Sequence, residues 1–243
     1  PMKTAEAWQM SNAPVLSITT VVDVTCAGGS DGNADLSVTG GVAPYIWSWQ
    51  GGISSSSSAS GLASGIYNVT VSDASGCQSF IQVTITEPNA IAIQMSQPVT
   101  ICIGGNTVIS GSASGGTQPY TYSWSDGSTT AQVNVNPVTS TSYVLTVTDS
   151  KGCAVTSNPL PISVFQQLNL TASYPDSVCK NTSATITLNA SGGDGNYTYS
   201  WSNGQAGVSN SINIISDTTL VVTLQDGCTT PQQQTTISIA AVN

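Results

Sequence analysis

Gly40-Gly-Val-Ala-Pro-Tyr-Ile-Trp-Ser-Trp49 is the stretch that decides the fold, and the chain repeats its pattern at Gly115–Trp124 and Gly192–Trp201. In every copy three aromatic rings stand two residues apart: Tyr45, Trp47 and Trp49; Tyr120, Tyr122 and Trp124; Tyr197, Tyr199 and Trp201. Successive side chains of a strand point to opposite faces, so the rings of one copy share a face. Aromatic rings dominate the energetics of small cores, so we predict a core strand in each copy. An exposed row of rings that stacks on sugars is the alternative interpretation.

The repeat continues on both sides of this stretch. Trp49, Trp124 and Trp201 are 75 and 77 residues apart, and the six cysteines keep nearly the same step. A period of this length is too long for a solenoid unit and long enough for a sandwich with its own core. We therefore predict an all-β chain of three tandem immunoglobulin-like antiparallel β-sandwich domains in an elongated, semi-rigid array. The predicted segments are residues 1–14, 15–88, 89–165 and 166–243.

Short runs of alternating residues mark further strands in each repeat. In the first repeat they cover residues 15–22, 34–38, 65–71 and 80–85, and a serine-rich stretch over 51–60 predicts a polar loop or a short edge strand. The second repeat has a corresponding run over 142–147. Tyr67 and Tyr143 are placed like the tyrosine of a tyrosine corner, whose hydroxyl bonds back to the backbone. Leu220 occupies that place in the third repeat.

Charge is scarce, and this excludes several classes of function. The chain has twelve acidic residues, three lysines and no histidine. Nucleic acid and anionic membrane surfaces attract clustered basic residues, so we expect neither as a partner. Histidine bases, arginine clamps and zinc sites lack their residues, so we expect no enzyme and no cofactor. No apolar run is long enough to span a bilayer, so membrane insertion is not expected either.

The first repeat contains one weak candidate for a metal site. Asp23, Asp31 and Asp35 lie close together in the first repeat, and calcium prefers oxygen ligands. The other two repeats lack this trio, so solvated loop carboxylates are the favoured interpretation.

The six cysteines fall two to a repeat, about fifty residues apart. The spacing predicts the pairs Cys26–Cys77, Cys102–Cys153 and Cys179–Cys228, each closing one repeat at the end where it meets its neighbour. Such a loop closure is worth roughly 4 kcal/mol in the chain-entropy model. Regularly spaced pairs also indicate an oxidising compartment outside the cytoplasm.

Residues 1–14 stand outside the repeats. They predict either a linker or a segment that docks on another subunit, because Trp8 and Met10 are costly to leave in water. The chain starts at Pro1, so we expect a processed form or a fragment of a longer protein.

The first repeat resembles the SprB repeat, a module of large surface proteins of gliding Bacteroidetes. The resemblance rests on Cys26-x-Gly28, Ser30-Asp-Gly32, Gly40-Gly41, Pro44-Tyr45, Trp49, Gly61-Leu62, the run from Gly65 to Asp73, Gly76-Cys77 and the run from Val83 to Pro88. The second and third repeats look more like related immunoglobulin-like or PKD-like repeats of the same proteins. The resemblance implies export by type IX secretion, display at the cell surface, and a part in adhesion or gliding. It also implies O-glycosylation at Asp-Ser/Thr motifs, which makes Ser177 and Thr218 candidates.

Three functions follow from these observations. The first is a non-catalytic structural or adhesive stalk of an extracellular surface protein. The second is a repeating subunit of an extracellular filament, assembled through a terminal segment that adds to its neighbour. The third is a carbohydrate-binding accessory module of a secreted polysaccharidase. The expected partners are accordingly neighbouring copies or domains of the same protein, and polysaccharide for the third function.

Overall fold

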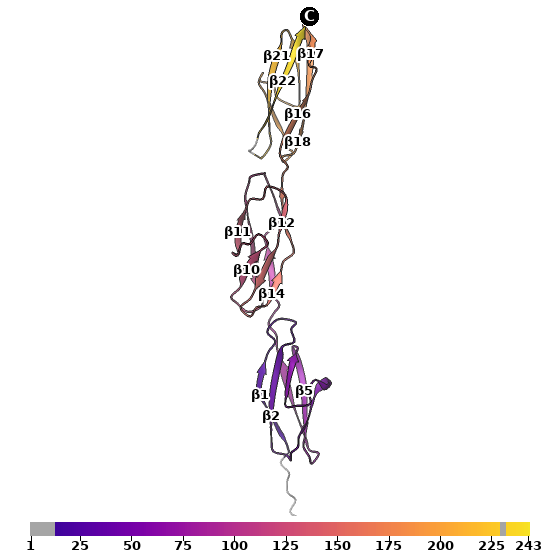
Figure 1. Ribbon diagram of the computed structural model, residues 1–243, viewed down its shortest axis with the longest axis vertical. Helices are drawn as coiled ribbons and strands as arrows, with labels where there is room; N and C mark the ends of the chain where they lie inside the picture. Colours follow the sequence, from indigo (N-terminus) through magenta and orange to yellow (C-terminus); the bar gives the residue numbers. More distant parts are fainter. Residues whose placement is uncertain (1–12, 229–231) are drawn as a thin grey trace, which may run out of the picture. The chain divides into compact units, whose positions relative to one another are not determined.

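The computed structural model describes residues 13–228 and 232–243, and these residues are almost entirely strands and turns. The one helix among them is a short 3₁₀ turn, η1, at Gln50–Gly52. Every strand pairs with strands of its own repeat, in the groups coloured from indigo to yellow in Figure 1. The prediction of an all-β chain is therefore confirmed.

The first repeat contains two three-stranded sheets, with the orders β1-β2-β4 and β3-β5-β6. Their strands are β1 (Val15–Val22), β2 (Gly32–Thr39), β3 (Ile46–Trp49), β4 (Ser58–Leu62), β5 (Gly65–Ser72) and β6 (Gln78–Ile85). Neighbouring strands are antiparallel, and β5 pairs with β6 along its whole length, from Gly65 opposite Ile85 to Ser72 opposite Gln78. The four strands predicted from alternation in this repeat are all present. The serine-rich stretch forms η1, a loop and the start of β4.

The second repeat follows the same plan with shorter strands. They are β7 (Ala92–Met95), β8 (Val99–Ile101), β9 (Thr107–Ser114), β10 (Thr121–Trp124), β11 (Gln132–Val135), β12 (Thr141–Tyr143), β13 (Leu145–Thr148), β14 (Ala154–Thr156) and β15 (Leu160–Val164). Their sheet orders are β11-β9-β7, β10-β13-β14 and β12-β15-β8. The single run predicted over 142–147 is divided at Val144 between β12 and β13, which belong to different sheets.

The third repeat contains a three-stranded and a four-stranded sheet, with the orders β16-β18-β20 and β17-β22-β21-β19. Its strands are β16 (Asn169–Ser173), β17 (Ser177–Cys179), β18 (Thr182–Ser191), β19 (Thr198–Trp201), β20 (Ser209–Ile214), β21 (Thr218–Gln225) and β22 (Gln233–Val242). In all three repeats the segment around the first cysteine lies beside the end of the last strand. In the second and third repeats it pairs with that strand in parallel, and in the first repeat it bonds to the residue that follows the strand. This is seen as Val24 N–H donating to Thr86 O, as β8 beside β15, and as β17 beside β22.

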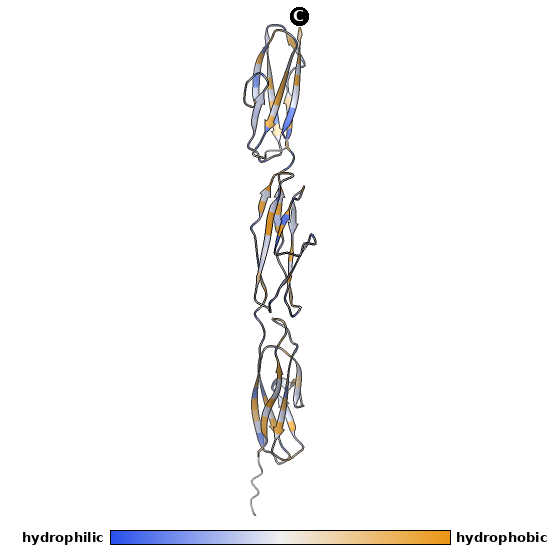
Figure 2. Ribbon diagram, turned by 90° about the vertical axis from the view of Figure 1, so that its left-hand side faces the viewer, coloured by the Kyte–Doolittle hydropathy of each residue, from blue (hydrophilic) through white to orange (hydrophobic). Residues whose placement is uncertain are grey.

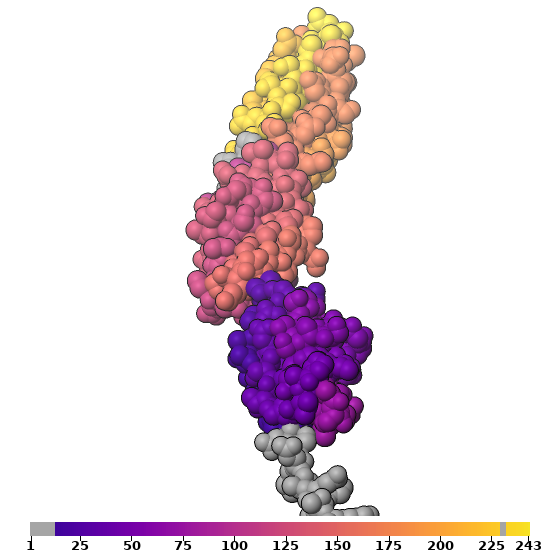
Figure 3. Space-filling model, turned by 60° about the horizontal axis from the view of Figure 1, so that its bottom comes forward, coloured from indigo at the N-terminus to yellow at the C-terminus, as the bar shows by residue number. Residues whose placement is uncertain are grey.

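Each repeat buries its own apolar core between its sheets. Along β5 and β21 the residues alternate, so Val69 and Val71 are fully buried, as are Val222 and Leu224, and the residues between them face outward. Figure 2 shows this alternation as orange patches along paler strands. The space-filling view in Figure 3 shows the first repeat, in indigo to purple, as closely packed side chains. Separate cores of this kind confirm the sandwich prediction.

The chain divides into two compact units. One comprises the chain through Gln94 together with Ser112–Ser123 and Thr146–Thr156, and the other comprises Met95–Gly111, Trp124–Leu145 and Ser157–Asn243. The second repeat contributes strands to both units. The four-segment division and the elongated, semi-rigid arrangement stay predictions.

Candidate functional site

The disulfides join neighbouring repeats, which corrects the pairing expected from the sequence. Cys26 is bonded to Cys153 with a Cα–Cα distance of 5.6 Å, and Cys102 is bonded to Cys228 with a Cα–Cα distance of 5.5 Å. The predicted pairs Cys26–Cys77, Cys102–Cys153 and Cys179–Cys228 are therefore wrong. Cys77 and Cys179 are unpaired within this chain.

The last strand of each repeat explains why the two cysteines of one repeat cannot meet. In the first repeat Cys77 immediately precedes β6, whereas Cys26 lies two residues beyond Val24, which bonds to Thr86 just after β6 ends. Eight residues of strand span about 26 Å, whereas a disulfide requires Cα atoms about 5.5 Å apart. The two cysteines therefore lie at opposite ends of the sandwich.

The first cysteine of each repeat, which we call the exit cysteine, lies in a tight turn beside the last strand. Gly29 N–H donates to Cys26 O at 2.9 Å, and Gly105 N–H donates to Cys102 O at the same distance. The second residue after each cysteine has a positive φ, +75° at Gly28 and +76° at Gly104. Glycine adopts this conformation without strain. The two exit turns are thus the same structure.

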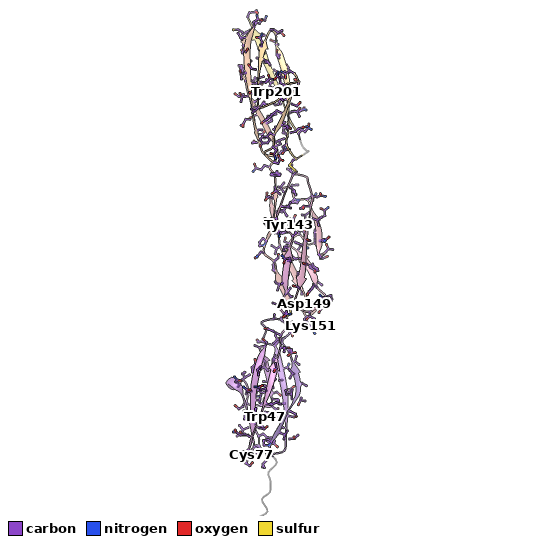
Figure 4. All side chains as sticks on the ribbon, turned by 180° about the vertical axis from the view of Figure 1, so that it is seen from behind. Trp47, Cys77, Tyr143, Asp149, Lys151 and Trp201 are labelled. Atoms are coloured by element: carbon purple, nitrogen blue, oxygen red, sulfur yellow. A yellow bond between two sulfur atoms is a disulfide. The ribbon has the colours of Figure 1, made fainter. Side chains whose placement is uncertain are left out.

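The second cysteine, which we call the entry cysteine, lies in a hairpin turn organised by a buried aspartate. At Asp149 the backbone N–H donates to Cys153 O at 2.9 Å, and Gly152 N–H donates back to Asp149 O at 3.1 Å. The side-chain Oδ1 of Asp149 accepts the N–H groups of Lys151 and Cys153, both at 2.9 Å, and Oδ2 accepts Thr117 N–H at 2.8 Å. Figure 4 labels Asp149 and Lys151 at the tip of this hairpin, and Cys77 at the tip of the equivalent hairpin of the first repeat. One carboxylate therefore holds the loop that presents Cys153.

The third repeat builds its entry turn with two fewer residues. Asp226 Oδ1 accepts Cys228 N–H at 3.1 Å, and its Oδ2 accepts Asp194 N–H at 2.9 Å. Asp194 in turn accepts Gly227 N–H at 3.1 Å. The shorter turn keeps the aspartate-to-cysteine hydrogen bond and still places Cys228 in its disulfide.

A cavity of about 290 Å³ lies next to the Cys26–Cys153 bond. Apolar side chains of Ala27, Pro88, Ile91 and Val155 contribute to its lining. Glu87, the residue before Pro88, accepts Gly28 N–H at 2.5 Å through its carboxylate. The exit turn of the first repeat is therefore tied both to the chain that leaves the repeat and to the entry cysteine of the next repeat.

The predicted aromatic strands are present as β3, β10 and β19, but each begins one residue after its first tyrosine, so only the second and third rings of each copy lie on the strand. The rings are buried to different depths. Trp49, Trp124 and Trp201 are 1%, 3% and 3% exposed, whereas the other six rings are half-buried. Each of the three tryptophans donates its indole N–H to a backbone carbonyl in the next turn: Ser56 at 2.8 Å, Thr130 at 2.8 Å and Gly207 at 2.9 Å. Ile46, which alternates with the rings, is 70% exposed. The rings thus serve the core, and the exposed sugar-stacking row is not what the structure shows.

The first tyrosine of each aromatic strand has a function that the sequence analysis missed. The hydroxyls of Tyr45, Tyr120 and Tyr197 donate to the carbonyl of the first glycine of the preceding Gly-Gly pair, at 2.6, 2.5 and 2.7 Å. Each tether spans five residues and fixes the glycine turn beside the entry hairpin. The constant five-residue spacing between this glycine and the tyrosine in all three copies is the sequence pattern that could have predicted the tether.

The tyrosine-corner prediction is confirmed in one repeat. Tyr67 donates its hydroxyl to Ala63 O, four residues upstream, at 2.9 Å. Tyr143 has no such bond in the structure. Burial and the nearby Asp126 carboxylate raise the pKa of its hydroxyl.

Comparison with known proteins finds one family that is similar to the repeats. The SprB repeat family model matches residues 18–53, 100–129 and 171–206, one segment in each repeat. Each repeat thus contains a segment that is similar to the SprB repeat. The match in the second and third repeats extends the resemblance beyond the first repeat, on which the sequence analysis placed it. SprB repeats belong to cell-surface proteins, and the disulfides fit an extracellular protein.

Solved structures of multidomain proteins are similar to most of the chain. The titin I-band fragment I67–I69 is 14% identical, with 95% of this chain and 99% of that chain covered and a TM-score of 0.46. The three N-terminal domains of the Highly Immunogenic Outer Capsid protein of bacteriophage RB49 are 15% identical, with 95% and 100% covered and a TM-score of 0.43. No curated protein matches the chain.

The weak calcium candidates of the first repeat do not form a common site. Asp23 accepts Thr86 N–H at 2.7 Å, Asp31 accepts Thr25 N–H at 3.0 Å, and Asp35 accepts the Thr20 hydroxyl at 2.7 Å. The hydrogen bonds with Thr86 and Thr25 lower the pKa of Asp23 and Asp31, and hydrogen bonds from the side chains of Ser58 and Thr20 lower the pKa of Asp35. Within residues 13–228 and 232–243, no group of three or more acidic, cysteine or histidine side chains could hold a metal ion. The three carboxylates each bond to a different partner instead.

The remaining candidates stand as follows. Ser177 is exposed on β17, and Thr218 is half-buried on β21 with its hydroxyl donated to Ser216 O at 2.8 Å. Their glycosylation stays a prediction. Trp8 and Met10 lie outside the described residues. No helix in the described part of the chain is long and apolar enough to cross a membrane.

The buried aspartate of the entry turn gives a prediction about acid stability. The N–H of Thr117 donates to the Asp149 carboxylate and lowers its pKa below the ordinary value, against the opposing effect of desolvation. A lowered pKa stabilises the fold above the unfolded pKa, and this contribution is lost as the pH falls below about 4 through the folded pKa. We expect Asp149→Asn to lower the melting temperature of the second repeat at pH 7 and to reduce its loss of stability in acid.

The matched control is Asp126→Asn, because Asp126 is exposed and accepts only Ser128 N–H in the structure. Thermal melts of both variants between pH 3 and 7 provide the measurement. An Asp149→Asn variant as sensitive to acid as the unsubstituted protein would show that this carboxylate does not organise the turn.

Proposed function

We propose that this chain is a non-catalytic spacer and adhesive segment of a protein displayed at the cell surface, where it serves adhesion or gliding. The observation that carries the proposal is the pair of disulfides that bond successive SprB-like repeats. Such bonds form and persist in oxidising surroundings outside the cytoplasm. Type IX secretion is the export route that we propose for it.

The disulfides suit a mechanical task. Two separate sandwiches joined only by a short linker can bend and separate at that linker. A covalent bond between the exit cysteine of one repeat and the entry cysteine of the next adds a second connection across the same junction. If the linker is cleaved by a protease or stretched by an applied force, the disulfide then still joins the two repeats.

The burial of the tryptophan rings favours a structural task over polysaccharide binding. A sugar platform requires rings that face solvent, whereas Trp49, Trp124 and Trp201 are buried and donate their indole N–H groups internally. Immunoglobulin-like repeats of this kind are typically non-catalytic. A filament subunit that docks through residues 1–14 stays a prediction, because nearly all of that segment lies outside the described residues.

Cells that carry the parent protein provide the test. An antibody raised against residues 13–243 should label intact cells. Replacement of residues 15–243 by an unrelated stretch of three immunoglobulin domains should then distinguish a role as a spacer from a role in adhesion. Attachment that survives the replacement assigns spacing to the segment, and attachment that is lost assigns adhesion. Labelling that appears only after permeabilisation would contradict the proposal.

A further inference from the structure

The two disulfides follow one rule, and the rule leaves one cysteine over at each end of the array. Cys26 and Cys102 are exit cysteines, and each is bonded to the entry cysteine of the following repeat, Cys153 and Cys228. The entry cysteine of the first repeat, Cys77, and the exit cysteine of the third repeat, Cys179, are unpaired in this chain. The leftover pair is therefore one entry cysteine and one exit cysteine, which are complementary in kind.

Cys77 lies in the same turn that places Cys153 in its disulfide. Asp73 N–H donates to Cys77 O at 2.9 Å, Gly76 N–H donates to Asp73 O at 3.0 Å, and Cys77 N–H donates to Asp73 Oδ1 at 2.9 Å. The corresponding distances around Asp149 agree within 0.1 Å. The φ of Gly76 is +86° and that of Gly152 is +87°. Asp73 is 4% exposed, so the turn is fixed before any partner arrives.

Cys179 lies in the exit turn that Cys26 and Cys102 share. The second residue after it, Asn181, has a φ of +62°, which is the one positive value of a non-glycine residue in the described part of the chain. The hydroxyl of Thr182 donates to Cys179 O at 2.5 Å, where Gly29 and Gly105 use their backbone N–H groups. Cys179 pairs in parallel with Val242 of the last strand. Its side chain is exposed, as an unused exit cysteine requires.

We propose that Cys179 of one copy of this chain forms a disulfide with Cys77 of the next copy, so that copies join head to tail. The new bond repeats, between molecules, the linkage that the chain already contains twice. Because the two surfaces are different, each added copy leaves a free Cys77 and a free Cys179, and the assembly is an open chain rather than a closed dimer. The proposal rests on the disulfide pattern and not on the proposed surface function.

The chemistry requires an electron acceptor. One S–S bond forms between the two sulfurs, and the two thiols together release two protons and two electrons. A small-molecule disulfide such as oxidised glutathione accepts them: its S–S bond breaks, and two glutathione thiols leave. The reaction proceeds through a mixed disulfide after attack by a thiolate.

Single cysteine variants of the purified chain distinguish this linkage from others. Incubated with oxidised glutathione, the unsubstituted chain should form a ladder of covalent multimers on a non-reducing gel. Cys77→Ser and Cys179→Ser should each stay monomeric when incubated alone. An equimolar mixture of the two variants should yield dimers and no larger species, because each variant supplies only one half of the bond.

Both substitutions leave the internal disulfides in place, so melting temperatures equal to that of the unsubstituted chain will show that folding is unaffected. Absence of a ladder, or dimers of either variant alone in the same yield as in the mixture, would overturn the proposal. Native material in which Cys77 is bonded to a cysteine outside this sequence would overturn the assignment of the partner to a second copy.

Discussion

Replacement of Trp49 by alanine should unfold the first repeat while the second and third stay folded. Trp49 is 1% exposed, lies in the core cluster with Leu36, Val69 and Val83, and donates its indole N–H to Ser56. Truncation of a buried tryptophan costs about 3–5 kcal/mol, and the Ser56 carbonyl also loses its partner. A repeat of this length has a free energy of unfolding of roughly 4–11 kcal/mol, so the change removes a large part of it.

Hydrogen exchange followed by mass spectrometry measures the unfolding of each repeat separately. We expect fast exchange throughout β3, β5 and β6 and unchanged protection in β18, β21 and β22. Ile46→Ala is the matched control: Ile46 lies on the same strand but is 70% exposed, so its stability should change by less than about 0.5 kcal/mol. If both variants exchanged alike, the ring would not be the centre of the core.

A single oxidised chain pulled by its ends should extend only about two fifths as far as a reduced one. The shortest covalent path runs along residues 1–26, crosses the Cys26–Cys153 bond, returns along residues 153–102 and crosses the Cys102–Cys228 bond to residues 228–243. This path contains 94 of the 243 residues. A stretched residue contributes about 3.5 Å, so reduction should increase the final extension about 2.6-fold.

The overlap of the two loops makes this prediction specific. Removing either bond alone, for example with Cys26→Ser/Cys153→Ser, leaves a path of about half of the chain, so the extension should increase by only about a quarter. Only removal of both bonds should give the full extension of the reduced chain. Disulfides confined to single repeats would behave differently, since each loss would then add about fifty residues independently. Force spectroscopy of the single and double variants is the measurement.

The sequence predicted the strands well because their signals are local. Alternation over residues 15–22 and 65–71 identified β1 and β5, and the ring spacing in the three copies identified β3, β10 and β19. The prediction failed where a single run serves two sheets, at Val144, because pairing partners and not alternation decide that division.

The disulfide pairing could not be predicted from spacing. Six cysteines allow fifteen connectivities, and sequence alone does not choose among them. The decisive fact is that an eight-residue strand separates Cys77 from the end of the sandwich at which Cys26 lies. The run over 80–85 places Cys77 before the last strand, but only the hydrogen bond between Val24 and Thr86 places Cys26 beside the other end of that strand. The buried aspartates of the entry turns escaped notice, because burial of a carboxylate depends on backbone donors that only the fold brings together.

One cleavage experiment on the unreduced protein tests directly whether the cysteines pair across repeats. With free thiols blocked, cyanogen bromide cleaves after Met10 and Met95, and trypsin cleaves after Lys151 and Lys180. The cleavage leaves Cys26 and Cys77 on one piece, Cys102 on a second, Cys153 and Cys179 on a third, and Cys228 on a fourth. Mass spectrometry should find two separate products: residues 11–95 bonded to 152–180, and residues 96–151 bonded to 181–243. Residues 11–95 found alone, with the other three pieces bonded to one another, would contradict the account.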